Sequence, residues 1–184
     1  MSEFADEEQL LIDTVRRFAV EQLAEQAGAI DESEDFAGCH IPAMADLGLM
    51  GLNLPECWGG VGITAAALLE SVAAVAGGCA ATASLLTAHF LATDALLLGG
   101  GDPLKQRFLP LAARGDMLGA FALTEPDAGS NPADMRTRAE RTASGYRIRG
   151  AKQFISNAAH ADFVVVFALT DAAARHRGIS AFVV

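Results

Sequence analysis

The sequence is poor in cysteine and shows no spacing typical of a metal site. Its 184 residues include three cysteines, Cys39, Cys57 and Cys79, none of them in a CxxC pair, and four histidines without ligand spacing. An odd cysteine count of this kind argues against a disulfide framework and against a structural zinc site. We therefore expect no bound metal, and we expect reduced thiols in a cytoplasmic protein.

The sequence also lacks an excess of basic residues and a basic leader. It has 13 lysines and arginines against 23 aspartates and glutamates, for a net charge of −10. Nucleic-acid binding needs a basic surface, so nucleic acid is not an expected partner. The first ten residues, MSEFADEEQL, are acidic and do not resemble a signal peptide.

A long run of large apolar residues is absent as well. Residues 71–93 carry no formal charge and are numerous enough to cross a bilayer. Small side chains dominate this stretch, however, and Gly77 and Gly78 interrupt it. We therefore expect two helices buried in a helical bundle, and no membrane span.

What the sequence does contain is enough apolar side chain for a core and an uneven distribution of charge. Hydrophobic residues make up 52% of the chain, too many for a disordered segment. Residues 1–116 hold 17 acids and 5 bases, whereas residues 117–184 hold 6 acids and 8 bases. This shift favours two units with different roles, although ordinary surface variation is the alternative. The second unit could tolerate an anionic ligand.

Residues 1–116 have the pattern of an all-α domain. Leu11, Val15 and Phe18 lie at helical spacing, in a helix that we expect to end at Gly28 and the acidic residues after it. Further helices are predicted over 43–47, 65–76, 81–98 and 103–113. The loop NLPECWGGVGIT separates the second of these five from the third, and it lacks the flanking strand and Lys-Ser/Thr pair of a phosphate-binding loop.

Residues 117–184 have the pattern of strands. Apolar or alternating runs occur over 118–123, 146–149, 163–167 and 179–184, with a weaker one over 137–141. The order of helices before strands predicts an α+β fold, with an N-terminal all-α domain followed by an incomplete antiparallel β-barrel-like domain. Because the last run stops at Val184 and would leave an apolar edge, we expect a missing segment or a partner chain to cover it.

The stretch LTEPDAGS, residues 123–130, contains the residues that carry chemistry. Pro126 fixes a turn, Gly129 permits a left-handed or closely approached backbone, and Ser130 adds a hydroxyl group. Successive backbone N–H groups in such a turn can bind an anion such as a pyrophosphate. From these residues alone, an anion site and a plain turn remain equally open.

Four segments in order make the chain resemble the acyl-CoA dehydrogenase family. They are LPECWGGVG, DPLKQRFLPLAARGDMLGAFALTEPDAGS, GYRIRGAKQFISNAAHADFVVVFA and RGISAFVV, which together with their spacing extend over nearly the whole chain. The resemblance implies a flavoprotein of fatty acid metabolism that binds FAD. Its implied activity is α,β-desaturation of an acyl-CoA thioester, with hydride transfer to flavin N5.

The resemblance also implies which residues contact the cofactor. Leu123 and the Thr124 hydroxyl would meet the flavin ring, and Gly129 and Ser130 the pyrophosphate, with Ser130 also near the acyl-CoA. Phe154 and Ser156 occupy positions where the family commonly has Trp and Thr. The full implied cofactor-binding set is Phe121, Leu123, Thr124, Gly129, Ser130, Phe154, Ile155 and Ser156.

No catalytic residue is expected in this chain. The family's base is a glutamate of a C-terminal domain, whereas Glu125 has the context of a structural residue and Lys152 that of a surface or turn residue. The resemblance further implies an electron-transfer flavoprotein as electron acceptor, a missing C-terminal half or partner chain, and a homo-oligomer. Two alternatives stay open: a flavin-dependent oxidase or monooxygenase on the same scaffold, and a non-catalytic truncated or split subunit.

Overall fold

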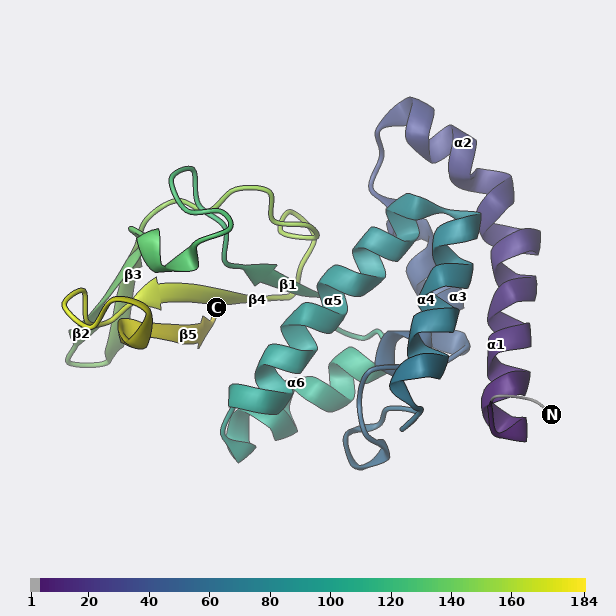
Figure 1. Cartoon of the computed structure of the whole chain (residues 1–184), viewed down its shortest axis with the longest axis horizontal. Coiled ribbons are helices and arrows are strands. Elements are labelled where there is room, and N and C mark those ends of the chain that lie inside the picture. The colour runs from purple at the N-terminus through teal and green to yellow at the C-terminus, as the bar shows by residue number, and fades with distance from the viewer. Residues whose placement is uncertain (1–3) are drawn as a thin grey trace. The chain divides into compact units, whose positions relative to one another are not determined.

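The computed structural model describes residues 4–184 and divides them into two units, a helical one that ends at Met117 and a β unit, Leu118–Val184 (Figure 1). The order of helices before strands confirms the predicted α+β class. The helical unit consists of α1 (Asp6–Phe18), α2 (Ala24–Ser33), α3 (Ile41–Asp46), α4 (Ala65–Gly78), α5 (Ala80–Gly99) and α6 (Asp102–Ala113).

The first helix is longer than its sequence suggests. A π-helical turn, Ala19–Leu23, joins α1 to α2, and the helical path continues past Gly28 to Ser33. The prediction that Gly28 ends this element was therefore wrong, whereas the predicted end in the acidic residues 31–35 is confirmed. A single glycine costs a helix only about 1 kcal/mol, which the surrounding residues tolerate. The helix ends instead where Glu34 takes a left-handed backbone conformation with φ 57°.

Helix α5 forms the centre of the helical unit. Among the described residues, α5 is the one helix that is long and apolar enough to cross a membrane. Inside the protein, 56% of its most apolar 18-residue stretch is buried. Leu86, Ala92 and His89 on this helix have no exposed surface. Burial of this extent is typical of the core helix of a globular unit, where apolar residues surround the whole helix.

Helix α4 packs closely against the π-helical turn through a glycine. A Cβ atom at Gly78 would lie 2.6 Å from the Ala19 carbonyl oxygen, so only glycine fits there. The neighbouring Gly77 has nothing within 4 Å of the same position. One of two adjacent glycines is therefore needed for packing, and the other is not.

The β unit contains one open, mixed sheet of five strands. Its strands are β1 (Gly119–Ala122), β2 (Arg138–Thr142), β3 (Gly145–Arg149), β4 (Phe163–Leu169) and β5 (Ile179–Val183). The order of paired strands is β1-β4-β2-β3, and β5 also pairs with β4, outside this order. Strand β4 is the centre of the sheet, and its sequence FVVVFAL has the continuous apolar character of a strand with two covered faces.

The sheet corrects one detail of the predicted fold. The pairs β2–β3 and β4–β5 are antiparallel, but β1–β4 and the short β2–β4 contact are parallel, and the sheet does not close into a barrel. The parallel pairs arise because the chain between β1 and β4 is long enough to return in the same direction. Sequence patterns predicted the strands without predicting these long-range partners.

We predict opposite effects for alanine at the two adjacent glycines of α4. Gly77→Ala should raise the free energy of unfolding by roughly 0.5–1 kcal/mol, because alanine favours the helix and meets nothing. Gly78→Ala should lower it by about 1–3 kcal/mol through the clash with Ala19. Urea unfolding followed by the fluorescence of Trp58, the single tryptophan, measures both. Equal effects of the two changes would contradict this packing.

Candidate functional site

Strand β1 leads directly into the turn of residues 123–130. The turn is closed by two backbone hydrogen bonds, in which Glu125 N donates to Ala128 O at 2.9 Å and Ala128 N donates to Glu125 O at 3.2 Å. Gly129 does not have a left-handed backbone, and a Cβ atom there would meet nothing within 4 Å. The fold of the protein therefore does not require glycine at this position. The exposed backbone of Gly129 is open to the close approach of a ligand.

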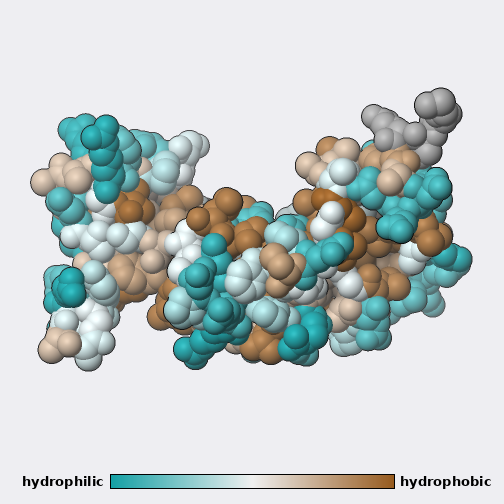
Figure 2. Space-filling view, turned by 90° about the horizontal axis from the view of Figure 1, so that it is seen from below, coloured by the Kyte–Doolittle hydropathy of each residue, from teal (hydrophilic) through white to brown (hydrophobic). Residues whose placement is uncertain are grey.

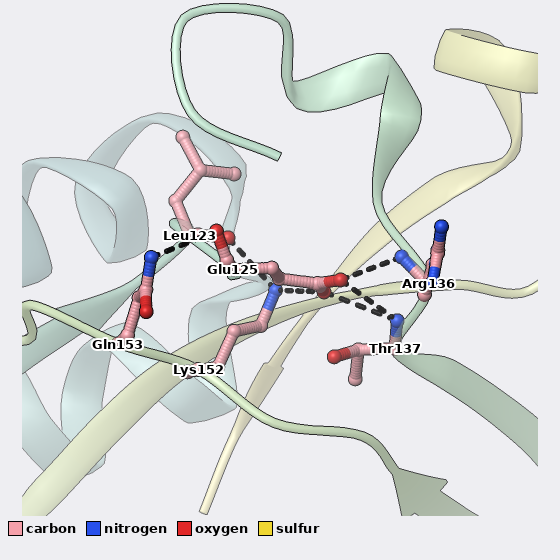
Figure 3. A network of polar contacts seen from close by, with 6 residues as sticks. All are labelled: Leu123, Glu125, Arg136, Thr137, Lys152 and Gln153. Atoms are coloured by element: carbon pink, nitrogen blue, oxygen red, sulfur yellow. Dashed lines mark hydrogen bonds and ion pairs between the residues drawn. The ribbon is translucent and has the colours of Figure 1, made fainter. Parts of the chain in front are cut away.

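The carboxylate of Glu125 lies at the centre of a buried polar network (Figure 3). Its side chain is 3% exposed, and Oε1 lies 2.8 Å from Lys152 Nζ. The backbone N–H of Arg136 donates to Oε2 at 2.6 Å, and that of Thr137 donates to Oε1 at 3.1 Å. Glu125 is thus used as an internal anchor, in agreement with its predicted structural role.

The same network joins the turn to residues 152–153. Lys152 Nζ donates to Leu123 O at 2.9 Å, Gln153 N to Thr124 O at 3.1 Å, and Gln153 Nε2 to Glu125 O at 3.3 Å. Three successive carbonyl groups of the first segment are therefore held by two residues of the second. Figure 3 shows Lys152 and Gln153 extending from one loop segment toward the turn.

The prediction that Lys152 lies at the surface or in a turn was wrong. Its side chain is only 12% exposed, because it reaches across to Leu123 and Glu125. The sequence around Lys152 contains no local sign of this, since its partners are 27 and 29 residues away. The one available signal was that Glu125, if structural and buried, needs a cation. Gln153 was missed for the same reason.

The network determines the protonation of Glu125. Burial by itself would raise the pKa of this carboxyl group, but the hydrogen bonds from the Lys152 ammonium and from the backbone N–H groups of Arg136 and Thr137 lower it more. The result is a pKa lowered from 4.5 to about 2. Glu125 is therefore ionised at every physiological pH.

The second segment continues into an unusual backbone conformation. Phe154 has a left-handed φ of 56° and is 86% exposed, and Asn157 has a φ of 67°. A bulky residue with positive φ is strained, and such strain gathers at functional sites. Asn157 is itself buried, and its Nδ2 donates to Gly119 O at 3.2 Å, which ties the segment back to β1.

A largely apolar cavity of about 470 Å³ lies beside these segments, within the β unit. Ala122 of β1 and Val164 and Val166 of β4 contribute from one face of the sheet, because Ala122 pairs with Val166. The second segment supplies another wall. The cavity is lined by Ala122, Lys152, Gln153, Phe154, Ile155, Ala158, Val164, Val166 and Val184.

The predicted cofactor-binding residues do not all lie at this cavity. Phe154 and Ile155 line it, whereas Phe121 lies on the opposite face of β1, with its ring 4.9 Å from that of Phe167. Any contact of Phe121 with a ligand in the cavity would involve its backbone. Leu123 and Thr124 begin the turn, and Gly129, Ser130 and Ser156 are exposed.

Three of these residues carry hydroxyl groups that the protein does not use. Within residues 4–184, no hydrogen-bond partner is found for the side chains of Thr124, Ser130 and Ser156. Hydroxyl groups both donate and accept hydrogen bonds, so all three are available to a polar ligand. The arrangement can hold a flat apolar group in the cavity and polar groups along its edge.

Comparisons with known proteins agree, over both units, with the family resemblance seen in the sequence. The chain matches the family described as "Acyl-CoA dehydrogenase, N-terminal domain" over residues 5–116 and that described as "Acyl-CoA dehydrogenase, middle domain" over residues 120–184. A cyclohex-1-ene-1-carbonyl-CoA dehydrogenase from Syntrophus aciditrophicus is 38% identical over 188 residues, which cover 100% of this chain and 45% of that protein.

Solved structures agree with these matches. A glutaryl-CoA dehydrogenase from Mycobacterium smegmatis in complex with FADH2 is similar with a TM-score of 0.90 and 32% identity, over 98% of this chain and 46% of that one. A chain in a structure of the electron transferring flavoprotein of Acidaminococcus fermentans has a TM-score of 0.94 and 31% identity, over 100% and 49%. The chain spans about half the length of the curated relatives it matches.

The lowered pKa of Glu125 predicts a specific acid sensitivity. Because its pKa is depressed in the folded protein, the stabilisation is complete above pH 4.5 and is lost as the pH falls from there toward about 2. At ~1.4 kcal/mol per pKa unit, this loss is roughly 3–4 kcal/mol, and Glu125→Gln should remove it. Hydrogen exchange of the buried β4 amides across this pH range measures the effect.

Asp127→Asn is the matched control for this experiment. It removes a carboxylate of the same turn whose ion pair with Arg136 is exposed, and exposed pairs contribute little to stability. This variant should keep the pH dependence of the unchanged protein. The account would be contradicted if Glu125→Gln kept that dependence too.

Proposed function

This chain belongs to the acyl-CoA dehydrogenase family, and we propose that it forms the helical domain, residues 1–116, and part of the flavin-binding domain, residues 117–184, of an FAD-dependent enzyme that desaturates an acyl-CoA thioester. The observation that carries this proposal is the apolar cavity between β1, β4 and residues 152–155. It lies beside a turn whose hydroxyl groups have no partner among residues 4–184.

The residues present fit FAD. An apolar cavity suits a flat aromatic ring, and Phe154 offers an exposed aromatic face at its wall. Leu123, Thr124 and Ser156 would bind the polar edge of the ring, with the backbone of Phe121 and the side chain of Ile155 completing the contact. The open backbone at Gly129 and the hydroxyl of Ser130 suit a pyrophosphate, and Ser130 would also lie near the acyl-CoA.

FAD would supply the acceptor for a hydride from the acyl group. The residues of this protein would bind and orient the cofactor. Glu125 does not serve as the base in this proposal. Its carboxylate is buried, binds Lys152 and two backbone N–H groups, and has a pKa of about 2, far too low for a proton acceptor at neutral pH. The base would come from a segment that these 184 residues do not contain.

The same proposal extends to the substrate and the electron acceptor. The helical unit would form a wall of the acyl pocket, in line with relatives named for acyl-CoA thioesters. An electron-transfer flavoprotein would take the electrons, which the similarity to a chain in an electron transferring flavoprotein structure supports. We expect the assembled enzyme to be a homo-oligomer.

The direct test is an anaerobic titration of the complete protein, loaded with FAD, with a panel of acyl-CoA thioesters. The proposal predicts loss of the oxidised flavin absorbance with at least one thioester. No change with any of them would refute the dehydrogenase function. Reoxidation by oxygen with release of peroxide would identify an oxidase or monooxygenase on this scaffold, and a colourless protein that takes up no FAD would identify a non-catalytic subunit.

The free hydroxyl groups generate a second prediction. Thr124→Ala and Ser156→Ala should each weaken FAD binding by roughly three- to tenfold, the value of about one hydrogen bond. Ser144→Ala is the control, because Ser144 lies exposed in the β2–β3 turn, away from the cavity lining. Titration of FAD fluorescence measures all three. Unchanged affinity in both site variants would remove these hydroxyl groups from the proposed site.

A further inference from the structure

We propose that Glu125 and Lys152 are positioning residues for the flavin, whose ion pair fixes the register between residues 123–125 and residues 152–155. This inference rests on the proposed function and deepens it. The two side chains would act on cofactor affinity through the backbone segments they join. Neither needs to touch the reacting atoms.

The burial of the pair is the first reason. The side chains of Lys152 and Glu125 are 12% and 3% exposed, and their charged atoms lie 2.8 Å apart. Removing two charges from water is costly, and apolar residues of similar size often stabilise a protein as well or better. The pair stabilises the fold relative to a single unpaired charge, but apolar residues could stabilise it as well, so stability alone is a poor explanation of the pair. A fixed geometry is a better one, because hydrogen-bonded charges specify the positions of their partners by direction and distance.

The second reason is the position of the pair in the chain. Glu125 accepts hydrogen bonds from Arg136 and Thr137, immediately before β2, and Lys152 comes shortly after β3. The ion pair therefore joins the turn to both ends of the β2–β3 hairpin. Gly150 lets these ends approach, because a Cβ atom there would clash with Thr137.

The third reason is where the fixed segment leads. Lys152 and Gln153 line the cavity, and the next two residues are Phe154 and Ile155, which line it too. A slip of one residue against the turn would shift each of these side chains by one position along the cavity wall. The bonds from Lys152 to Leu123 and from Gln153 to Thr124 prevent that slip. They thereby determine which side chains face the cavity.

Four variants of the complete protein test the proposal: Glu125→Gln, Lys152→Met, the double variant and the control Asp127→Asn. FAD affinity is measured by fluorescence titration, and the exchange rate of the Gln153 amide is measured without FAD, since this amide binds Thr124 O. Stability is measured by urea unfolding. Asp127→Asn removes an exposed ion pair of the same turn.

Each single variant should lose FAD affinity by roughly 10- to 100-fold, the value of about one hydrogen bond to a charged group, and should exchange the Gln153 amide faster. The double variant should recover most of the lost stability, because it leaves no lone buried charge. It should not recover FAD affinity. Asp127→Asn should match the unchanged protein in all three measurements.

The outcomes separate this proposal from the proposed function. If the unchanged protein binds FAD and both single variants bind it equally well, the positioning role is overturned and the function stands. If the double variant regains affinity together with stability, the pair is merely structural and the positioning role is again overturned. If the unchanged protein binds no FAD, the proposed function fails, and the claim of a cofactor-positioning role fails with it. In that case, exchange of the Gln153 amide still tests whether the ion pair fixes the register. If this amide exchanges as slowly in Lys152→Met as in the unchanged protein, that claim is overturned too.

Discussion

The contact between the Glu125 carboxylate and the Lys152 ammonium is the constraint on which the β unit's candidate site depends. Two opposite charges that are both buried must remain together, because separating them leaves an uncompensated charge. Each side chain also forms hydrogen bonds with the backbone of a neighbouring segment. The ion pair therefore holds together residues 123–125, 136–137 and 152–153. The position of the cavity wall follows from an electrostatic requirement as much as from apolar packing.

The sequence predicted those parts of the fold that local patterns determine. The helices expected at 65–76 and 81–98 are α4 and α5, and the run at 163–167 is the central strand β4. It did not predict the parallel β1–β4 pairing or the burial of Lys152, because both depend on residues far away in the chain. The sequence also did not predict the left-handed backbone conformation of Phe154. Surrounding contacts impose such a conformation, which is unfavourable to the residue itself.

The candidate site also shows how an acidic residue in a functional stretch can be scaffold. Glu125 lies within the turn, between the free hydroxyl groups of Thr124 and Ser130, where a sequence search for a general base would select it. Its four hydrogen bonds and lowered pKa leave it no capacity to take up a proton at neutral pH. The unpaired hydroxyl groups around it remain available to a ligand. Binding groups held in place by supporting hydrogen bonds are the arrangement that a preorganised site requires.

A crystal structure of the protein with FAD is the most direct measurement of this account. The account predicts the flavin ring in the cavity between Phe154, Val166 and Ala122, with the Ser130 hydroxyl at the pyrophosphate and the Glu125–Lys152 pair intact behind it. A flavin bound elsewhere, or bound in this cavity with the ion pair broken, would contradict it.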